Sequence, residues 1–170
     1  MKTSRRQFLK TSAAFAGFSI LPSGAWSNSP NSKFCTAYIG IGGMGGGVFK
    51  NIAEHPSVAV VGLADVDKEK FNHARFEAYP DVPRFADYRE MLKALGDKVD
   101  GVIISTPDHT HFPATKMAME MDKAVYTQKP LTHSIAEAYE LEKLAADRNL
   151  VTQMGIQLHS SIGNLSLIHI

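Results

Sequence analysis

The hexapeptide Gly40-Ile41-Gly42-Gly43-Met44-Gly45 follows an apolar run at residues 34–39 and precedes a predicted helix at residues 46–54. Glycines at this spacing also occur in ordinary tight turns, so the spacing alone is weak evidence. Its position between a strand and a helix is more specific. There, Gly40 permits a tight turn, Gly42 lets the backbone approach a pyrophosphate, and Gly45 allows close packing of helix on strand. The free N–H groups at the helix N-terminus would bind the phosphates, so the stretch predicts a dinucleotide-binding site.

An acidic residue stands where such a site needs one. Asp65 follows the continuous apolar run 58–64 and lies 20 residues beyond Gly45, the spacing expected of the acid that binds the adenosine ribose. A solvated aspartate at a strand end is the alternative interpretation. A carboxylate accepts a hydrogen bond from the ribose 2′-OH but repels a 2′-phosphate, and no arginine is adjacent to Asp65. We therefore expect NAD as the cofactor rather than NADP.

Strands and helices are predicted to alternate along the chain. Continuous apolar runs predict buried strands, and apolar residues repeated on one stripe predict helices. The predicted strands cover residues 34–39, 58–64, 99–105, 124–127 and 150–154, and the predicted helices cover 46–54, 68–79, 88–95, 112–121 and 134–148. This alternation is typical of an α/β domain of Rossmann type, with a doubly wound parallel sheet, here over residues 34–157.

Composition excludes several other classes of protein. The 170 residues, 44% of them hydrophobic, suffice for one α/β domain with a buried core. A formal net charge of +1 gives no electrostatic reason to expect nucleic acid as a partner. Cys35 is the single cysteine, which excludes an internal disulfide framework and a multi-cysteine metal site.

The first 27 residues have the order of a secretory signal. A basic stretch with the pair Arg5-Arg6 precedes an apolar segment at residues 12–21 and the small-residue pattern Ala25-Trp26-Ser27. The paired arginines resemble the twin-arginine class. A membrane anchor is the alternative, but the apolar segment is shorter than the ~20 residues that span a bilayer. We expect residues 1–27 to be a twin-arginine signal peptide that directs the protein to the periplasm, and residues 28–33 to be a flexible linker.

Two more polar motifs follow the ends of predicted strands. Thr106-Pro107-Asp108, with His111, follows strand 99–105, and Gln128-Lys129-Pro130 follows strand 124–127. The carboxyl ends of the strands of a doubly wound sheet face the crevice in which ligands bind. Together with the glycine loop, these motifs in this order resemble the Gfo/Idh/MocA oxidoreductase family, over about residues 34–159.

The resemblance implies a nicotinamide-dependent enzyme that oxidises or reduces a hydroxyl or ketone of a sugar, an inositol or a related polyol. Some exported relatives act on glycosides with NAD kept bound. It also implies that Lys129 is catalytic, beside the nicotinamide and the substrate; an exposed loop lysine is the alternative. Gln128 replaces the glutamate of the family motif. The implied cofactor-binding residues are Gly40, Ile41, Gly42, Gly43, Met44, Gly45, Asp65, Thr106, Pro107, Asp108, His111, Gln128, Lys129 and Pro130.

The histidines near these motifs raise the question of a metal site. His109, His111 and His133 are close in sequence, but no acidic or cysteine partner stands at a recognisable ligand spacing. His111 also matches a position of the family's motif, which implies a structural role or a place in the cofactor pocket. We therefore expect no metal.

The last residues, 158–170, match no pattern of the family. Family members have a second domain that supplies much of the substrate pocket, the oligomer interface and a catalytic histidine. We expect residues 158–170 to be a truncated tail, the substrate domain to be missing, and an oligomer to form only where that domain is present. Three functions remain open: an NAD-dependent sugar or glycoside enzyme, a nucleotide-binding module without catalysis, and a structural fragment that binds nothing.

Overall fold

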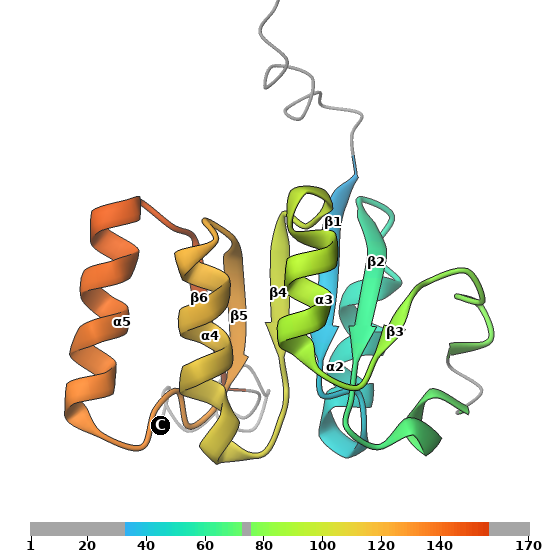
Figure 1. The fold of residues 1–170 in the computed structure, drawn as a ribbon, viewed down its shortest axis with the longest axis horizontal. Coiled ribbons are helices and arrows are strands. Elements are labelled where there is room, and N and C mark those ends of the chain that lie inside the picture. Colours follow the sequence, from blue (N-terminus) through green and yellow to red (C-terminus); the bar gives the residue numbers. More distant parts are fainter. Residues whose placement is uncertain (1–32, 73–75, 157–170) are drawn as a thin grey trace, which may run out of the picture. The chain divides into compact units, whose positions relative to one another are not determined.

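Six strands form one sheet in which every neighbouring pair runs parallel (Figure 1). They are β1 (Phe34–Ile39), β2 (Val58–Ala64), β3 (Arg84–Phe85), β4 (Gly101–Ile104), β5 (Ala124–Gln128) and β6 (Thr152–Gly155). Their order in the sheet is β3-β2-β1-β4-β5-β6, so the strand order reverses between β1 and β4, as in doubly wound dinucleotide-binding sheets. The computed structural model describes residues 33–72 and 76–156, and within them the predicted fold class is confirmed.

Helices cover both faces of the sheet (Figure 1). The helices are α2 (Gly43–Ala53), α3 (Tyr88–Leu95), α4 (His111–Glu120) and α5 (Ile135–Arg148), with short 3-10 segments η2 (Lys68–Asn72), η4 (Gly96–Lys98) and η5 (Asp108–Thr110). Successive side chains of a strand point to opposite faces. Ala37 and Ile39 therefore pack in the core shared with α3, α4 and α5, whereas Tyr38 packs in the core shared with α2.

Three aromatic rings fix α2 to the sheet. The centroid of the Phe49 ring lies 4.8 Å from that of Tyr38 and 4.9 Å from that of Phe76, in the tilted geometries that aromatic pairs favour. Burial raises the pKa of Tyr38 to about 12, so its hydroxyl stays neutral at physiological pH. The loop between β1 and α2 is thus anchored at both of its ends.

Several predicted elements end one or two residues from their observed bounds, and three larger details of secondary structure differ from the sequence prediction. α2 begins at Gly43 rather than at residue 46, so part of the glycine loop already belongs to the first helical turn. The predicted helix 68–79 is wrong in its described part, where η2 and later turns replace it, because Phe71 and Phe76 are placed by the core beside α2 and not by a helical stripe. The two-residue strand β3, paired with the end of β2, was not predicted.

Several predicted segments lie outside the described residues. They are the signal peptide at 1–27, the linker apart from its last residue, and the tail at 158–170. Among the described helices, none is long and apolar enough to cross a membrane.

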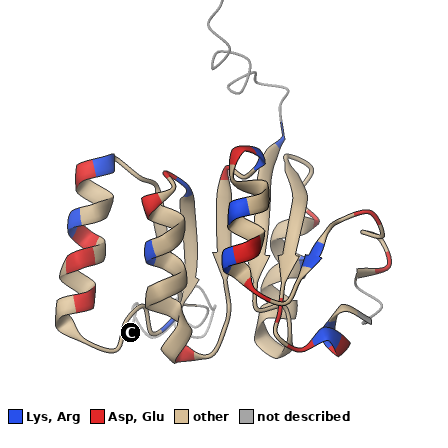
Figure 2. Ribbon diagram, in the orientation of Figure 1, with Lys and Arg blue, Asp and Glu red and all other residues tan. Residues whose placement is uncertain are grey.

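Charges of both signs are mixed over the helices (Figure 2). Lys116 on α4 pairs with Glu140 on α5 at 2.6 Å, and Arg148 pairs with Asp122 at 2.7 Å. Such pairs between exposed side chains are individually weak. In the view of Figure 2, α3, α4 and α5 each carry both acidic and basic residues, and none of them has a purely basic stripe.

Candidate functional site

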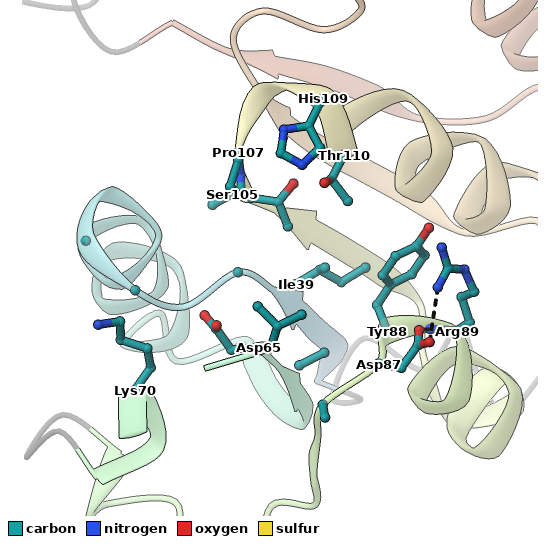
Figure 3. A pocket seen from close by; sticks show the side chains of 17 residues that line it. Ile39, Asp65, Lys70, Asp87, Tyr88, Arg89, Ser105, Pro107, His109 and Thr110 are labelled. Carbon is teal, nitrogen blue, oxygen red and sulfur yellow. Dashed lines mark hydrogen bonds and ion pairs between the residues drawn. The ribbon is translucent and has the colours of Figure 1, made fainter. Parts of the chain in front are cut away.

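A pocket of about 630 Å³ opens at the carboxyl ends of β1, β2 and β4, where the strand order reverses (Figure 3). Ligands of doubly wound sheets bind at this place. The lining residues come from four segments that are distant in sequence: Ile39, Gly40, Gly42 and Gly43; Ala64, Asp65, Val66 and Lys70; Ala86, Asp87, Tyr88 and Arg89; and Ser105, Thr106, Pro107, His109 and Thr110. The glycine loop, Asp65 and the motif after β4 are thus brought together.

The backbone of the glycine loop leaves no room for side chains at two of its positions. Gly40 has a φ of +78°, and a Cβ there would lie 2.7 Å from the carbonyl oxygen of Ser105. A Cβ on Gly45 would overlap the carbonyl oxygen of Gly40. These contacts are with backbone, which cannot move aside, so both residues must be glycine for α2 to start this close to β1 and β4.

Gly42 differs from Gly40 and Gly45 in its surroundings. It is the N-cap of α2, with extended dihedral angles that any residue can adopt. The three atoms nearest to a Cβ on Gly42 would all belong to the side chain of Lys70. The fold itself therefore does not require glycine here, and the space next to Gly42 belongs to the pocket. The first N–H groups of α2 lack acceptors within the helix, and no acidic side chain stands in its first turn.

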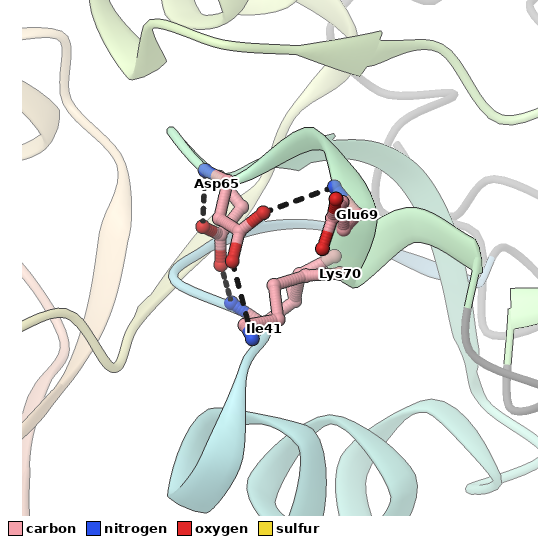
Figure 4. A network of polar contacts seen from close by, with 5 residues as sticks. Ile41, Asp65, Glu69 and Lys70 are labelled. Carbon is pink, nitrogen blue, oxygen red and sulfur yellow. Dashed lines mark hydrogen bonds and ion pairs between the residues drawn. The ribbon is translucent and has the colours of Figure 1, made fainter.

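Asp65, which follows β2, accepts a hydrogen bond from the glycine loop (Figure 4). One carboxylate oxygen accepts a hydrogen bond from the backbone N–H of Ile41 at 2.9 Å, and the other accepts one from Asp67 N–H at 3.0 Å. These bonds hold the carboxylate at the pocket wall beside the glycine loop. Each oxygen retains acceptor capacity for a further donor, which a ribose hydroxyl can supply.

Two residues that line this pocket, Ser105 and Thr106, have buried hydroxyl groups. Ser105 Oγ and Thr106 Oγ1 are inaccessible to solvent and have no hydrogen-bond partner among the described residues. Buried polar atoms are normally satisfied by protein, water or ligand. Their position beside the glycine loop fits a polar ligand in the pocket. Thr106 was among the predicted residues, whereas Ser105 was missed because its sequence signal is only that of a strand end.

His111 connects two of the predicted motifs without lining the pocket. Its side chain is 1% exposed. Nδ1 lies 2.7 Å from the carbonyl oxygen of Pro130, and Nε2 lies 2.8 Å from that of Thr106. Both partners only accept, so either neutral tautomer donates to one of them and the imidazolium donates to both. The ring therefore ties the loop after β5 to the loop after β4.

The motif after β5 lies outside the pocket lining. Gln128 is 6% exposed and donates from Nε2 to the hydroxyl of Tyr126 at 3.4 Å. Lys129 is exposed, and its backbone N–H donates to the carbonyl oxygen of Gly155 at 3.2 Å. Asp108 and Met44, also predicted, are exposed and do not line the pocket either. A catalytic role for Lys129 stays a prediction.

The far wall of the pocket was not predicted. The guanidinium of Arg89 lies over the Tyr88 ring at 4.9 Å and pairs with Asp87 at 3.0 Å. The backbone N–H of Arg89 holds the pKa of Asp87 below its usual range, assisted by the Arg89 side chain. This wall follows β3, a strand too short to leave a hydrophobic pattern, so the sequence offered no signal for it.

The described residues contain no group of three or more His, Cys, Asp or Glu side chains that could hold a metal ion. His109 lines the pocket, whereas His111 is buried behind it with both ring nitrogens against carbonyl oxygens.

Comparison with known proteins identifies the family. The model of the Gfo/Idh/MocA family, described as "Oxidoreductase family, NAD-binding Rossmann fold", matches residues 34–156. The chain belongs to this family. The part of this Gfo/Idh/MocA protein that the model matches is an NAD-binding Rossmann domain, which confirms the expected cofactor.

Relatives of this Gfo/Idh/MocA protein have several names. A "Glycosyl hydrolase family 109 protein" of Solibacter usitatus is 30% identical, with 82% of this chain matching 36% of that protein. An "Inositol 2-dehydrogenase" of Rubrobacter xylanophilus is 29% identical, with 61% of this chain matching 29% of that protein. The chain thus spans about a third of the length of these curated relatives.

Solved structures share the fold. GenD2 from gentamicin A biosynthesis, in complex with NAD, superimposes with a TM-score of 0.65 at 25% identity, over 73% of this chain and 34% of that chain. The scyllo-inositol dehydrogenase of Lactobacillus casei with bound NAD(H) and scyllo-inositol gives a TM-score of 0.71 at 18% identity, over 81% of this chain and 40% of that chain.

Proposed function

We propose that this chain is the cofactor-binding part of an oxidoreductase that acts on a hydroxyl group of a sugar, a polyol or a glycoside. The observation that supports it best is that the glycine loop, Asp65 and the segment of Ser105 and Thr106 line one pocket. The names of the relatives, inositol 2-dehydrogenase and glycosyl hydrolase family 109 protein, support the substrate class.

Different residues of the pocket would bind different parts of NAD. The N–H groups of Gly43 and its neighbours at the start of α2 would bind the pyrophosphate, Asp65 would accept a hydrogen bond from the ribose, and the segment of Ser105 and Thr106 would form the wall of the pocket at the end of β4. Bound NAD supplies the acceptor for a hydride. Lys129 is proposed to hold the reacting hydroxyl and to take up its proton, which requires hydrogen-bond reach to the substrate.

The glycoside reaction is a second candidate, because the glycosyl hydrolase relative matches 82% of this chain, against 61% for the inositol dehydrogenase. On a glycoside, the oxidation would be transient and NAD would be regenerated. The dehydrogenase and glycosidase reactions are distinguished by incubating the protein with a polyol or with a nitrophenyl glycoside. Net NADH formation favours the dehydrogenase, and nitrophenol release without NADH favours the glycosidase. Binding of NAD without either reaction is the result expected of a nucleotide-binding module.

The cofactor preference tests the role of Asp65. We expect the chain to bind NAD about tenfold or more tightly than NADP, because the carboxylate repels a 2′-phosphate. Asp65→Asn keeps one acceptor for the loop N–H groups but removes the charge, so it should weaken NAD binding by about tenfold, the effect of a hydrogen bond to a charged group. NADP binding should weaken less or improve.

The measurement is a calorimetric titration of both cofactors. Asp81→Asn, on an exposed residue outside the pocket, is the control and should change neither affinity. A wild-type chain that binds NADP as tightly as NAD would contradict the assignment of Asp65 to the ribose.

We further propose that residues 1–27 direct the protein to the periplasm by the twin-arginine pathway. Replacing Arg5 and Arg6 together by Lys should leave the protein inside the cell, because the receptor distinguishes the guanidinium pair from two ammonium groups. Cell fractionation of the bacterium measures this, with Lys2→Arg/Lys10→Arg as the matched control that preserves export. Unchanged export of the Arg5→Lys/Arg6→Lys variant would show that a different signal operates.

A further inference from the structure

Lys70 occupies the space that opens next to Gly42. The side chain starts from η2, lines the pocket and runs along the glycine loop (Figure 3). A Cβ on Gly42 would lie 3.2 Å from both Cδ and Cε of Lys70. Because Gly42 is the position at which a dinucleotide approaches the loop backbone, the methylenes of Lys70 lie where the ligand must pass.

The ammonium group of Lys70 is held only by a surface ion pair. Nζ lies 3.1 Å from the Oδ2 atom of Asp67, and the two side chains are 49% and 43% exposed. Ion pairs at this exposure are weak. Asp67 also has a structural role, since its Oδ1 accepts a hydrogen bond from the Glu69 N–H at 3.0 Å at the start of η2. Lys70 can therefore leave Asp67 without disturbing this hydrogen bond.

The distribution of charge around the pocket favours a contact between Lys70 and a ligand phosphate. Lys70 and Arg89 are the two lysine or arginine residues among those that line it, and Arg89 is paired with Asp87 on the opposite wall. Asp65, Asp67 and Glu69 put three carboxylates into the segment beside the glycine loop. A dinucleotide that enters this acidic segment gains from a cation at the phosphates.

Resting on the proposed function, we propose that Lys70 exchanges Asp67 for a phosphate group of the bound dinucleotide. In the free protein it covers Gly42, and in the complex its ammonium contacts the ligand. The chemistry is that of an ammonium and a phosphate. The phosphate is either the pyrophosphate at the start of α2 or a 2′-phosphate next to Asp65, and ligands that carry one or the other distinguish the two.

Lys70→Met tests the exchange, since methionine keeps the apolar contact with Gly42 and loses the charge. The 170-residue chain is titrated calorimetrically with NAD, ADP-ribose, NADP and adenosine. We expect about tenfold weaker binding of ligands that carry the contacted phosphate, the effect of one charge-assisted hydrogen bond, and unchanged binding of adenosine. A loss for NAD and ADP-ribose identifies the pyrophosphate. A loss for NADP alone identifies the 2′-phosphate. Lys68→Met, on a lysine outside the pocket lining, is the control.

Asp67→Asn tests the same exchange in the opposite direction. Asparagine retains the Oδ1 acceptor for the Glu69 N–H but releases Lys70 and removes a negative charge, so phosphate-bearing ligands should bind about threefold more tightly. Unchanged affinities in Lys70→Met, or an equal loss for adenosine, would overturn the inference while leaving the proposed function intact. If the wild-type chain binds neither NAD nor ADP-ribose, the proposed function falls, and this inference falls with it.

Discussion

Gly42→Val is expected to abolish NAD binding while the domain stays folded. The backbone of Gly42 is extended, with φ −80° and ψ 164°, which suits valine, and the atoms nearest to the added Cβ would be those of the flexible Lys70 side chain. The same side chain projects into the space that a dinucleotide needs beside the loop. We expect the affinity for NAD to fall by about 100-fold or more, the equivalent of ~2.7 kcal/mol, with little change in the unfolding temperature.

Two other glycines of the loop and helix provide matched controls for this variant. Gly47→Ala places a methyl group where nothing lies within 4 Å, so it should leave NAD binding unchanged and stabilise α2 by about 0.5–1 kcal/mol through helix propensity. Gly45→Ala would overlap the backbone of Gly40 and should destabilise the fold itself. Calorimetric titration and thermal unfolding of all three separate the two effects. Normal NAD affinity in Gly42→Val would show that the ligand does not approach this residue.

His111→Leu is expected to reduce the free energy of unfolding by about 1–3 kcal/mol. Leucine fills a similar volume but donates no hydrogen bond, so the carbonyl oxygen of Thr106 or Pro130 that accepts from the ring loses its partner inside the protein. An unsatisfied buried polar group costs about 1–3 kcal/mol. Because domains of this kind are stable by only about 5–15 kcal/mol, the loss would be large.

Urea unfolding followed by circular dichroism measures this effect. His109→Leu is the control, because His109 is exposed and only two positions away; it should change the free energy of unfolding by less than about 0.5 kcal/mol. Equal midpoints for His111→Leu and the wild type would show that the ring does not hold the two loops together. If it does, NAD binding should also weaken, because Thr106 lines the pocket.

The parts of the fold that depend on local pattern were predictable. β1 and β2 have the predicted bounds because each is a continuous apolar run, and α3 has them because its apolar residues repeat on one face. That the glycine loop and Asp65 lie together could be predicted, because a dinucleotide-binding turn requires particular residues at a fixed spacing.

The parts that depend on packing between distant segments were not predictable. β3 exists only because Arg84 and Phe85 pair with the end of β2, and two residues form no period. The positions of Lys70 and Ser105 in the pocket lining depend on the folded structure. Neither residue type nor spacing distinguishes them in the sequence from other lysines and serines. The motif after β5 was found by resemblance, and the pocket lining does not include it.

The pocket has one thermodynamic consequence. Its walls come from segments that follow β1, β2, β3 and β4, so no part of the chain contains the site until the sheet has formed. An unfolded chain therefore cannot hold the dinucleotide, and binding shifts the folding equilibrium of the whole domain. At a free NAD concentration 100 times the dissociation constant, this linkage adds about 2.7 kcal/mol to the free energy of unfolding. We therefore expect added NAD to slow the proteolysis of the domain.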